Sequence, residues 1–138
     1  MAAISITAAS VLQGADARVE QGIFGATITQ GQVCYLDATT GKMKLADADG
    51  AAALKVARCI ALNAGADGQP GTFLMSGDIT IGGTLTAGLP YFLSPDTPGG
   101  IALIADVAVG DDYVQIGIAE SATVLHVDIQ NSGFTRAA

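Results

Sequence analysis

The sequence predicts an all-β fold, a compact β-barrel or sandwich, and three observations support that prediction. Short apolar runs alternate with polar residues along most of the 138-residue chain, and glycine-rich turns separate them, with 18 glycines in all. This period is typical of strands that bury one face. Long stretches of apolar residues at helical spacing are missing. The third observation is an internal repeat, and the length fits a single domain.

The repeat is a segment of about fifty residues that occurs twice, at 25–77 and at 82–133. Such a shared order of glycines, threonines and apolar residues predicts two copies of one supersecondary unit. We therefore expect residues 25–138 to form one β domain built from two similar strand units. Two unrelated β-meanders with the same turn chemistry are the alternative. Matched positions include Gly25 and Gly82, Ile60 and Ile118, and the closing Ser-Gly pairs 76–77 and 132–133.

Each unit is expected to contain five strands in the same order. Gly41 and Gly99 can adopt the left-handed conformation that a tight hairpin between the second and third strands requires. Residues 78–81 alternate and predict one more strand between the units, and the alanine-rich stretch 47–56 is the one place where a helical turn is expected. The expected strands are 27–31, 32–37, 42–47, 55–62 and 71–77, then 84–88, 89–94, 100–106, 113–120 and 123–129.

The first 24 residues lie outside the repeat and predict an extended N-terminal arm with a tether. Ile4 and Ile6 alternate with polar residues as in a strand, whereas residues 13–22 are polar and are expected to form a loop. Such an arm can pair within its own sheet or add to the edge of another chain's sheet. The sequence leaves both arrangements open.

The charge distribution argues against direct binding of nucleic acid. The formal net charge is −7, and no Lys or Arg lies between Cys59 and Thr135. Phosphate backbones attract clustered cations, which are missing over this half of the chain. The N-terminus is too polar for a secretory signal, and no apolar run reaches the roughly 18 residues of a membrane span. We therefore expect no membrane partner.

No catalytic, cofactor-binding or metal-binding motif is recognisable, so we expect a protein that is not an enzyme. The single histidine, His126, falls in an expected strand, and no G-x-S-x-G nucleophile motif occurs. A zinc site made of Cys34, Cys59 and His126 would lack the closely spaced ligand pairs that such sites use. Without an export signal, free buried thiols are favoured over a Cys34–Cys59 disulfide, which stays the alternative.

Several of these stretches together resemble a known family. "GATITQGQVCYLD", "TTGKMKLADAD", "GADGQPG" and "SGDITIGGTLTAG" are similar to the capsid decoration, or cement, proteins of tailed bacteriophages. The resemblance covers residues 25–133 and rests on strand and turn patterns, not on a catalytic signature.

The resemblance implies a virion protein on the outer capsid surface, assembled in the host cytoplasm, commonly a homotrimer. It implies that the protein stabilises the head by bridging subunits of the major capsid protein. The arms of such proteins commonly lie along the shell, so Ile4, Ile6, Val11 and Leu12 are the expected capsid contacts. The alternative is a glycan- or receptor-binding module of a head fibre or tail, against which the low aromatic content argues.

Overall fold

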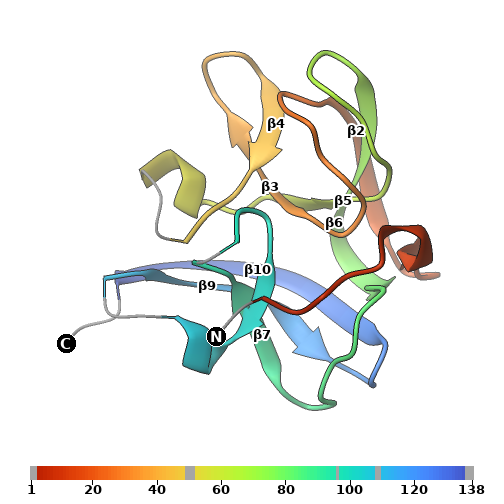
Figure 1. Ribbon diagram of the computed structural model, residues 1–138, viewed down its shortest axis with the longest axis vertical. Helices are drawn as coiled ribbons and strands as arrows, with labels where there is room; N and C mark the ends of the chain where they lie inside the picture. Colours follow the sequence, from red (N-terminus) through yellow and green to blue (C-terminus); the bar gives the residue numbers. More distant parts are fainter. Residues whose placement is uncertain (1–2, 49–51, 96, 108–109, 136–138) are drawn as a thin grey trace.

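The chain folds as an all-β protein, which confirms the predicted fold class. The computed structural model describes residues 3–48, 52–95, 97–107 and 110–135. Within these ranges ten strands form one curled antiparallel sheet (Figure 1). The strands are β1 (Leu12–Gln13), β2 (Arg18–Ile23), β3 (Val33–Asp37), β4 (Lys42–Leu45), β5 (Cys59–Ala61), β6 (Pro70–Thr80), β7 (Pro90–Leu93), β8 (Ile101–Leu103), β9 (Asp112–Ala119) and β10 (Val124–Thr135).

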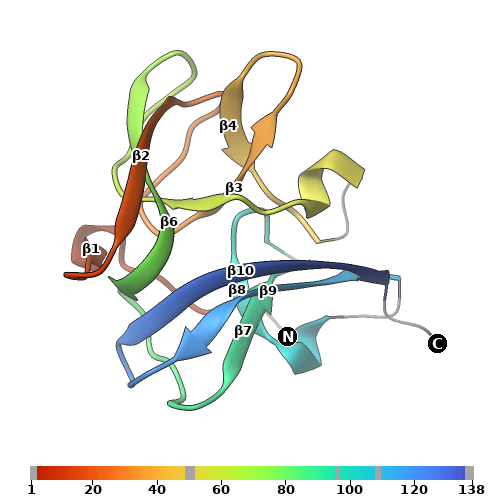
Figure 2. The same ribbon diagram turned by 180° about the vertical axis from the view of Figure 1, so that it is seen from behind.

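Strands of the two repeated segments occupy corresponding places in the sheet. The strand order is β4-β3-β5-β6-β10-β9-β7-β8. From each outer edge inward, a hairpin is followed by a partner strand and then by a long central strand. The pairing register corresponds as well, because Ile60 lies opposite Val33 and Ile118 lies opposite Pro90. The two groups of strands meet where β6 and β10 pair, and the groups are seen above and below this seam in Figure 2.

Two of the expected strands are not strands. The first element of each unit, 27–31 and 84–88, has no regular ladder: its middle bonds to a loop, and only its last glycine bonds to a strand. The Ile28 N–H donates to the Gly65 carbonyl and the Leu85 N–H donates to the Ala122 carbonyl. Both side chains are buried, so apolar burial produced the strand-like pattern without strand pairing.

The other expected strands are present with different bounds, and the expected strand 100–106 is wrong at its end, because residues 104–106 form a 3-10 turn. Residues 78–80 continue β6 and do not form a separate strand. The helical turn expected within 47–56 is confirmed as a 3-10 helix at Ala52–Lys55, although residues 49–51 lie outside the described residues. Further 3-10 turns occur at Ala8–Ser10 and Ile104–Asp106.

The expectation that residues 13–22 form a loop is wrong. Arg18–Ile23 is strand β2, which pairs antiparallel with residues 70–76 of β6. Polar side chains obscured the strand because most of β2 is exposed to solvent, and its hydrogen-bonded partner is distant in sequence.

Two apolar clusters form the core. The larger cluster includes strands from both groups, with Leu74, Tyr91, Ile116 and Leu125 among its buried side chains. The smaller cluster belongs to the first group: Phe24, Ile28, Cys34, Met43, Cys59, Ala61 and Phe73. The rings of Phe24 and Phe73 meet edge to face at a centroid distance of 5.3 Å. The first three residues of β3, Val33–Tyr35, are therefore buried on both faces of the strand, which explains why they are all apolar.

Gly77 lies where β6 passes from one group of strands to the other. Its φ of +101° is a conformation that other residues rarely adopt. A Cβ here would also lie 2.6 Å from the Asp16 carbonyl oxygen and 2.8 Å from the Ala17 Cα. A glycine is therefore required both by the backbone and by the close approach of the segment before β2.

We predict that Gly77→Ala lowers the free energy of unfolding more than Gly68→Ala does. Gly68 has a similar φ of +88° but no atom within 4 Å of its Cβ position, so its substitution should cost only about 1–2 kcal/mol of left-handed strain. Overlap with Asp16 and Ala17 should add about 1–3 kcal/mol for Gly77→Ala. Urea unfolding of both variants measures the difference, and equal losses would contradict this account of the packing.

Candidate functional site

The N-terminal arm lies along its own domain. The Ile4 N–H donates to the Ile101 carbonyl of β8, and the Thr7 N–H donates to the Gly82 carbonyl, both at 2.8 Å. The side chains of Ile4 and Ile6 are half-buried against the larger core cluster. Of the two arrangements that the sequence left open, the chain adopts the one within its own sheet.

Val11 and Leu12, the other two residues predicted to contact the capsid, face in opposite directions. Val11 is only 7% exposed and belongs to the core, whereas Leu12, opposite Thr80 in the β1–β6 pair, is 65% exposed. Ile4, Ile6 and Val11 therefore pack against the protein itself. Of the four predicted capsid contacts, only Leu12 exposes most of its side chain to solvent.

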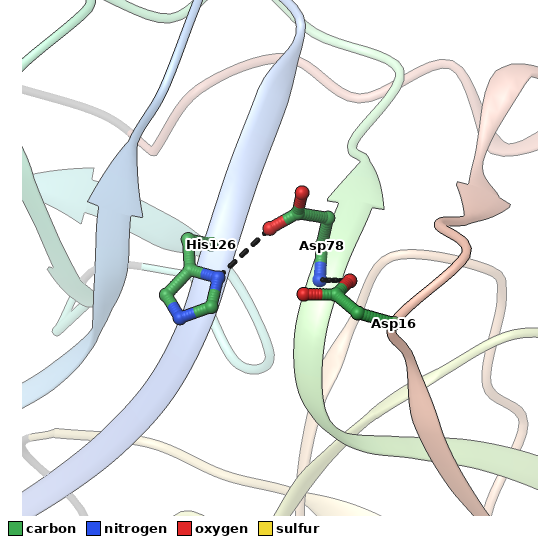
Figure 3. A group of neighbouring side chains, drawn as sticks. All are labelled: Asp16, Asp78 and His126. Atoms are coloured by element: carbon green, nitrogen blue, oxygen red, sulfur yellow. Dashed lines mark hydrogen bonds and ion pairs between the residues drawn. The ribbon is translucent and has the colours of Figure 1, made fainter.

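Three acidic residues surround His126 on the outer surface of the β6–β10 seam. His126 lies directly opposite Asp78 in the strand pairing, and its Nδ1 is 2.8 Å from the Asp78 Oδ1 (Figure 3). The Glu120 Oε1 lies 3.7 Å from the same nitrogen. Asp16, in the turn before β2, accepts a hydrogen bond of 2.9 Å from the Asp78 backbone N–H. We call these four residues the carboxylate–histidine cluster.

The cluster favours the protonated imidazole. The hydrogen bond to Asp78, assisted by the charges of Asp78 and Glu120, raises the pKa of His126 above its ordinary value of 6.5. Partial desolvation and repulsion from Asp78 raise the pKa of Glu120. A protonated His126 thus links β10 to β6 by a charge-assisted hydrogen bond, while the turn carrying Asp16 is attached to the same point.

The cluster contains side chains of the kind that ligate metal ions, but these side chains lie on a sheet surface and not in a cleft. One ligand atom each of Asp16, Asp78 and His126 lies within 4.8 Å of the others, a spacing that a divalent cation could bridge. The side chains of all three residues already take part in hydrogen bonds within the cluster, and the imidazole is about half exposed on a sheet surface. The geometry therefore provides a structural connection and a negatively charged surface.

The two cysteines lie apart from this cluster. Cys34 and Cys59 are opposite each other on β3 and β5, and both are buried as free thiols, which confirms the favoured prediction over the disulfide. A hydrogen bond to Cys59 and burial raise the pKa of Cys34, so its thiol stays protonated. The zinc set considered from the sequence is not assembled, because His126 is on the outer surface of β10.

Sequence reasoning identified His126 but missed Asp16, Asp78 and Glu120 as its neighbours. The repeat contains one indication that Asp78 lies near His126. It predicts similar last strands in the two units, and two such strands are candidates to pair with each other. The register that places Asp78 opposite His126 depends on β6 continuing beyond Gly77, which the sequence did not reveal.

Comparison with known proteins assigns no family. No protein-family model matches the chain, and no curated protein matches its sequence. In the part of the chain that the structure describes, no helix has the length and apolar character needed to cross a membrane.

We predict that Val11→Ala and Leu12→Ala differ in stability although the residues are adjacent. Removal of the buried Val11 methyl groups should lower the free energy of unfolding by about 1–2 kcal/mol. Leu12→Ala should change it by less than about 0.5 kcal/mol, because the Leu12 side chain is mostly in solvent. Chemical denaturation of both variants tests whether the arm is part of the folded unit; equal, negligible effects would show that it is not.

We predict that His126 titrates above 6.5 in the folded protein. Because the pKa is raised on folding, the pair adds to the free energy of unfolding below pH 6.5, and this contribution is lost as the pH rises through the raised pKa. The chain contains one histidine, so an NMR titration reports this pKa without assignment.

Asp78→Asn should lower the His126 pKa toward its ordinary value. Asp67→Asn, which removes a carboxylate paired instead with Lys42, serves as the control and should leave the titration unchanged. A His126 pKa at or below 6.5 in the wild-type protein would contradict the assignment of the Asp78–His126 pair.

Proposed function

We propose that this protein is a structural component of a bacteriophage head that binds the outer surface of the capsid. In this role it stabilises the shell by bridging subunits of the major capsid protein. The proposal includes no catalytic step and no cofactor. It rests on the resemblance of residues 25–133 to capsid decoration proteins and on one structural observation, the path of the N-terminal segment.

The N-terminal segment connects the outer strands of the sheet to its centre. Ile4 bonds to β8 at one edge, and β1 and β2 pair with the central strand β6. At the other edge, Phe24 bridges β4 and the Gly25 N–H donates to the Met43 carbonyl at 2.7 Å. Open sheet edges promote uncontrolled association, so partners at both edges suit a protein that is concentrated on a lattice.

The path of the N-terminal segment also suits a protein that must resist mechanical force. A segment that is hydrogen-bonded to both edges and to the middle of the sheet resists separation of the two groups of strands. The second half of the sequence carries no Lys or Arg between Cys59 and Thr135, which suits a surface turned to solvent and not to the packaged genome.

The proposed partners are the major capsid protein and further copies of this chain, most simply as a homotrimer. Many copies on one lattice can stabilise it strongly through individually weak contacts, because each bound leg raises the effective concentration of the next. The proposed location is therefore the outer capsid surface, reached from the host cytoplasm during assembly.

We predict that the purified protein binds empty, expanded heads and adds density to their outer surface at threefold or local threefold positions. Cryo-electron microscopy of the mixture measures location and stoichiometry together. Leu12→Asp should weaken binding roughly tenfold if the exposed Leu12 contacts the shell, since a charge would then be placed in an apolar contact.

The matched control is Ile104→Asp, which introduces the same charge at an exposed aliphatic residue on a different surface. Both variants should keep the unfolding midpoint of the wild type. Heads that carry no added density at saturating protein would refute the proposed function.

A further inference from the structure

A groove opens beside the seam, where β10 separates from β6. The two strands pair from Val124–Thr80 to Val127–Gly77; beyond this point β6 pairs with β5 instead. Strand β10 continues, and the Asn131 side chain spans the opening by hydrogen bonds of 3.0 Å to both the N–H and the carbonyl of Ala57. The groove between these elements has a volume of about 420 Å³, in the range of sites that bind ligands.

The groove is lined by both apolar and polar residues, and its apolar side chains are accessible. Val56 is 55% exposed and Leu36 is 42% exposed, and the half-buried Met75 and Ile129 complete the apolar lining. Exposed aliphatic side chains gathered around a hollow are typical of contact sites for another protein.

Negative charge borders the groove on one side. Asp128 lines it and, like His126 two residues earlier on β10, is exposed to solvent. Asp128 accepts a hydrogen bond from the neutral Gln130 amide and takes part in no ion pair among the described residues. The carboxylates of Asp78 and Glu120 continue this charge along the seam.

Among the described residues that line the groove, the one cation, Arg58, is already paired with a carboxylate. The Arg58 guanidinium lies 3.3 Å from the Glu20 carboxylate. The other basic residues of the described ranges, apart from Arg18, are also paired: Lys42 with Asp67, Lys44 with Asp37 and Lys55 with Asp112. A second copy of this acidic chain therefore has few free cations to place against Asp128, and a foreign protein complements the groove better.

We infer that this groove is the docking site for the shell, and that it receives an apolar side chain of the capsid protein flanked by a Lys or Arg. The apolar side chain packs among Val56, Leu36 and Met75, and the neighbouring cation lies against Asp128. The inference rests on the proposed function. It names a contact surface in addition to Leu12, which is needed because the other three arm residues pack inward.

Two single variants at exposed positions test this site. Val56→Ser and Asp128→Lys should each weaken binding to empty heads by about tenfold or more, and Asp128→Lys should also reduce the salt dependence of binding. The matched controls are Ile104→Ser, at an aliphatic residue 51% exposed, and Asp67→Lys, at an exposed carboxylate outside the groove. The controls should bind as the wild type does.

A direct readout identifies the occupant. A photo-reactive benzoylphenylalanine in place of Val56, activated on decorated heads, should cross-link to a peptide of the capsid protein that carries Lys or Arg beside an apolar residue. Cross-links only to a second copy of this chain, or wild-type binding by Val56→Ser and Asp128→Lys, would overturn the docking site while leaving the proposed function intact. Absence of binding by the wild-type protein would overturn both.

Discussion

Strand β6 is the constraint on which the rest of the molecule depends. One eleven-residue strand pairs with four others: with β2 and β5 along its first half, and with β10 and β1 after Gly77. Both groups of strands and the N-terminal segment are therefore fixed to the same backbone. The positive φ of Gly77 lets the strand change partners at this point, and only a residue without a Cβ also admits the turn that carries Asp16.

The change of partners also produces the surface features of the seam. Where β6 and β10 still pair, the cross-strand position of Asp78 and His126 forms a hydrogen-bonded link on the outside of the sheet. Where they separate, side chains from β3, from residues 56–58 before β5, and from β6 and β10 leave a groove lined by apolar and polar groups. The carboxylates of Asp78, Glu120 and Asp128 and the groove thus adjoin each other because β6 changes partners at Gly77, which places the proposed docking chemistry at the seam of the sheet.

The N-terminal segment stabilises the sheet, a role that its polar composition did not predict. Its hydrogen bonds reach both edge strands, and Val11 is part of the core, so the segment stabilises the sheet that it was expected only to adjoin. The exposed Leu12 is its one large aliphatic side chain left mostly in solvent. The proposed head-binding role therefore relies on the surface of the folded unit, with Leu12 at its margin, more than on a free arm.

The sequence by itself determined the all-β class, the corresponding strands of the two units, the helical turn near Lys55 and the free buried cysteines. Each of these follows from local alternation, turn chemistry or a pattern repeated at a fixed spacing. Only the tertiary structure decided that 27–31 and 84–88 bond to loops, that polar Arg18–Ile23 is a strand, and that Asp78 faces His126. These features depend on which distant backbone supplies the hydrogen-bond partner, and a period of two residues specifies that a strand has a buried face without specifying its neighbour.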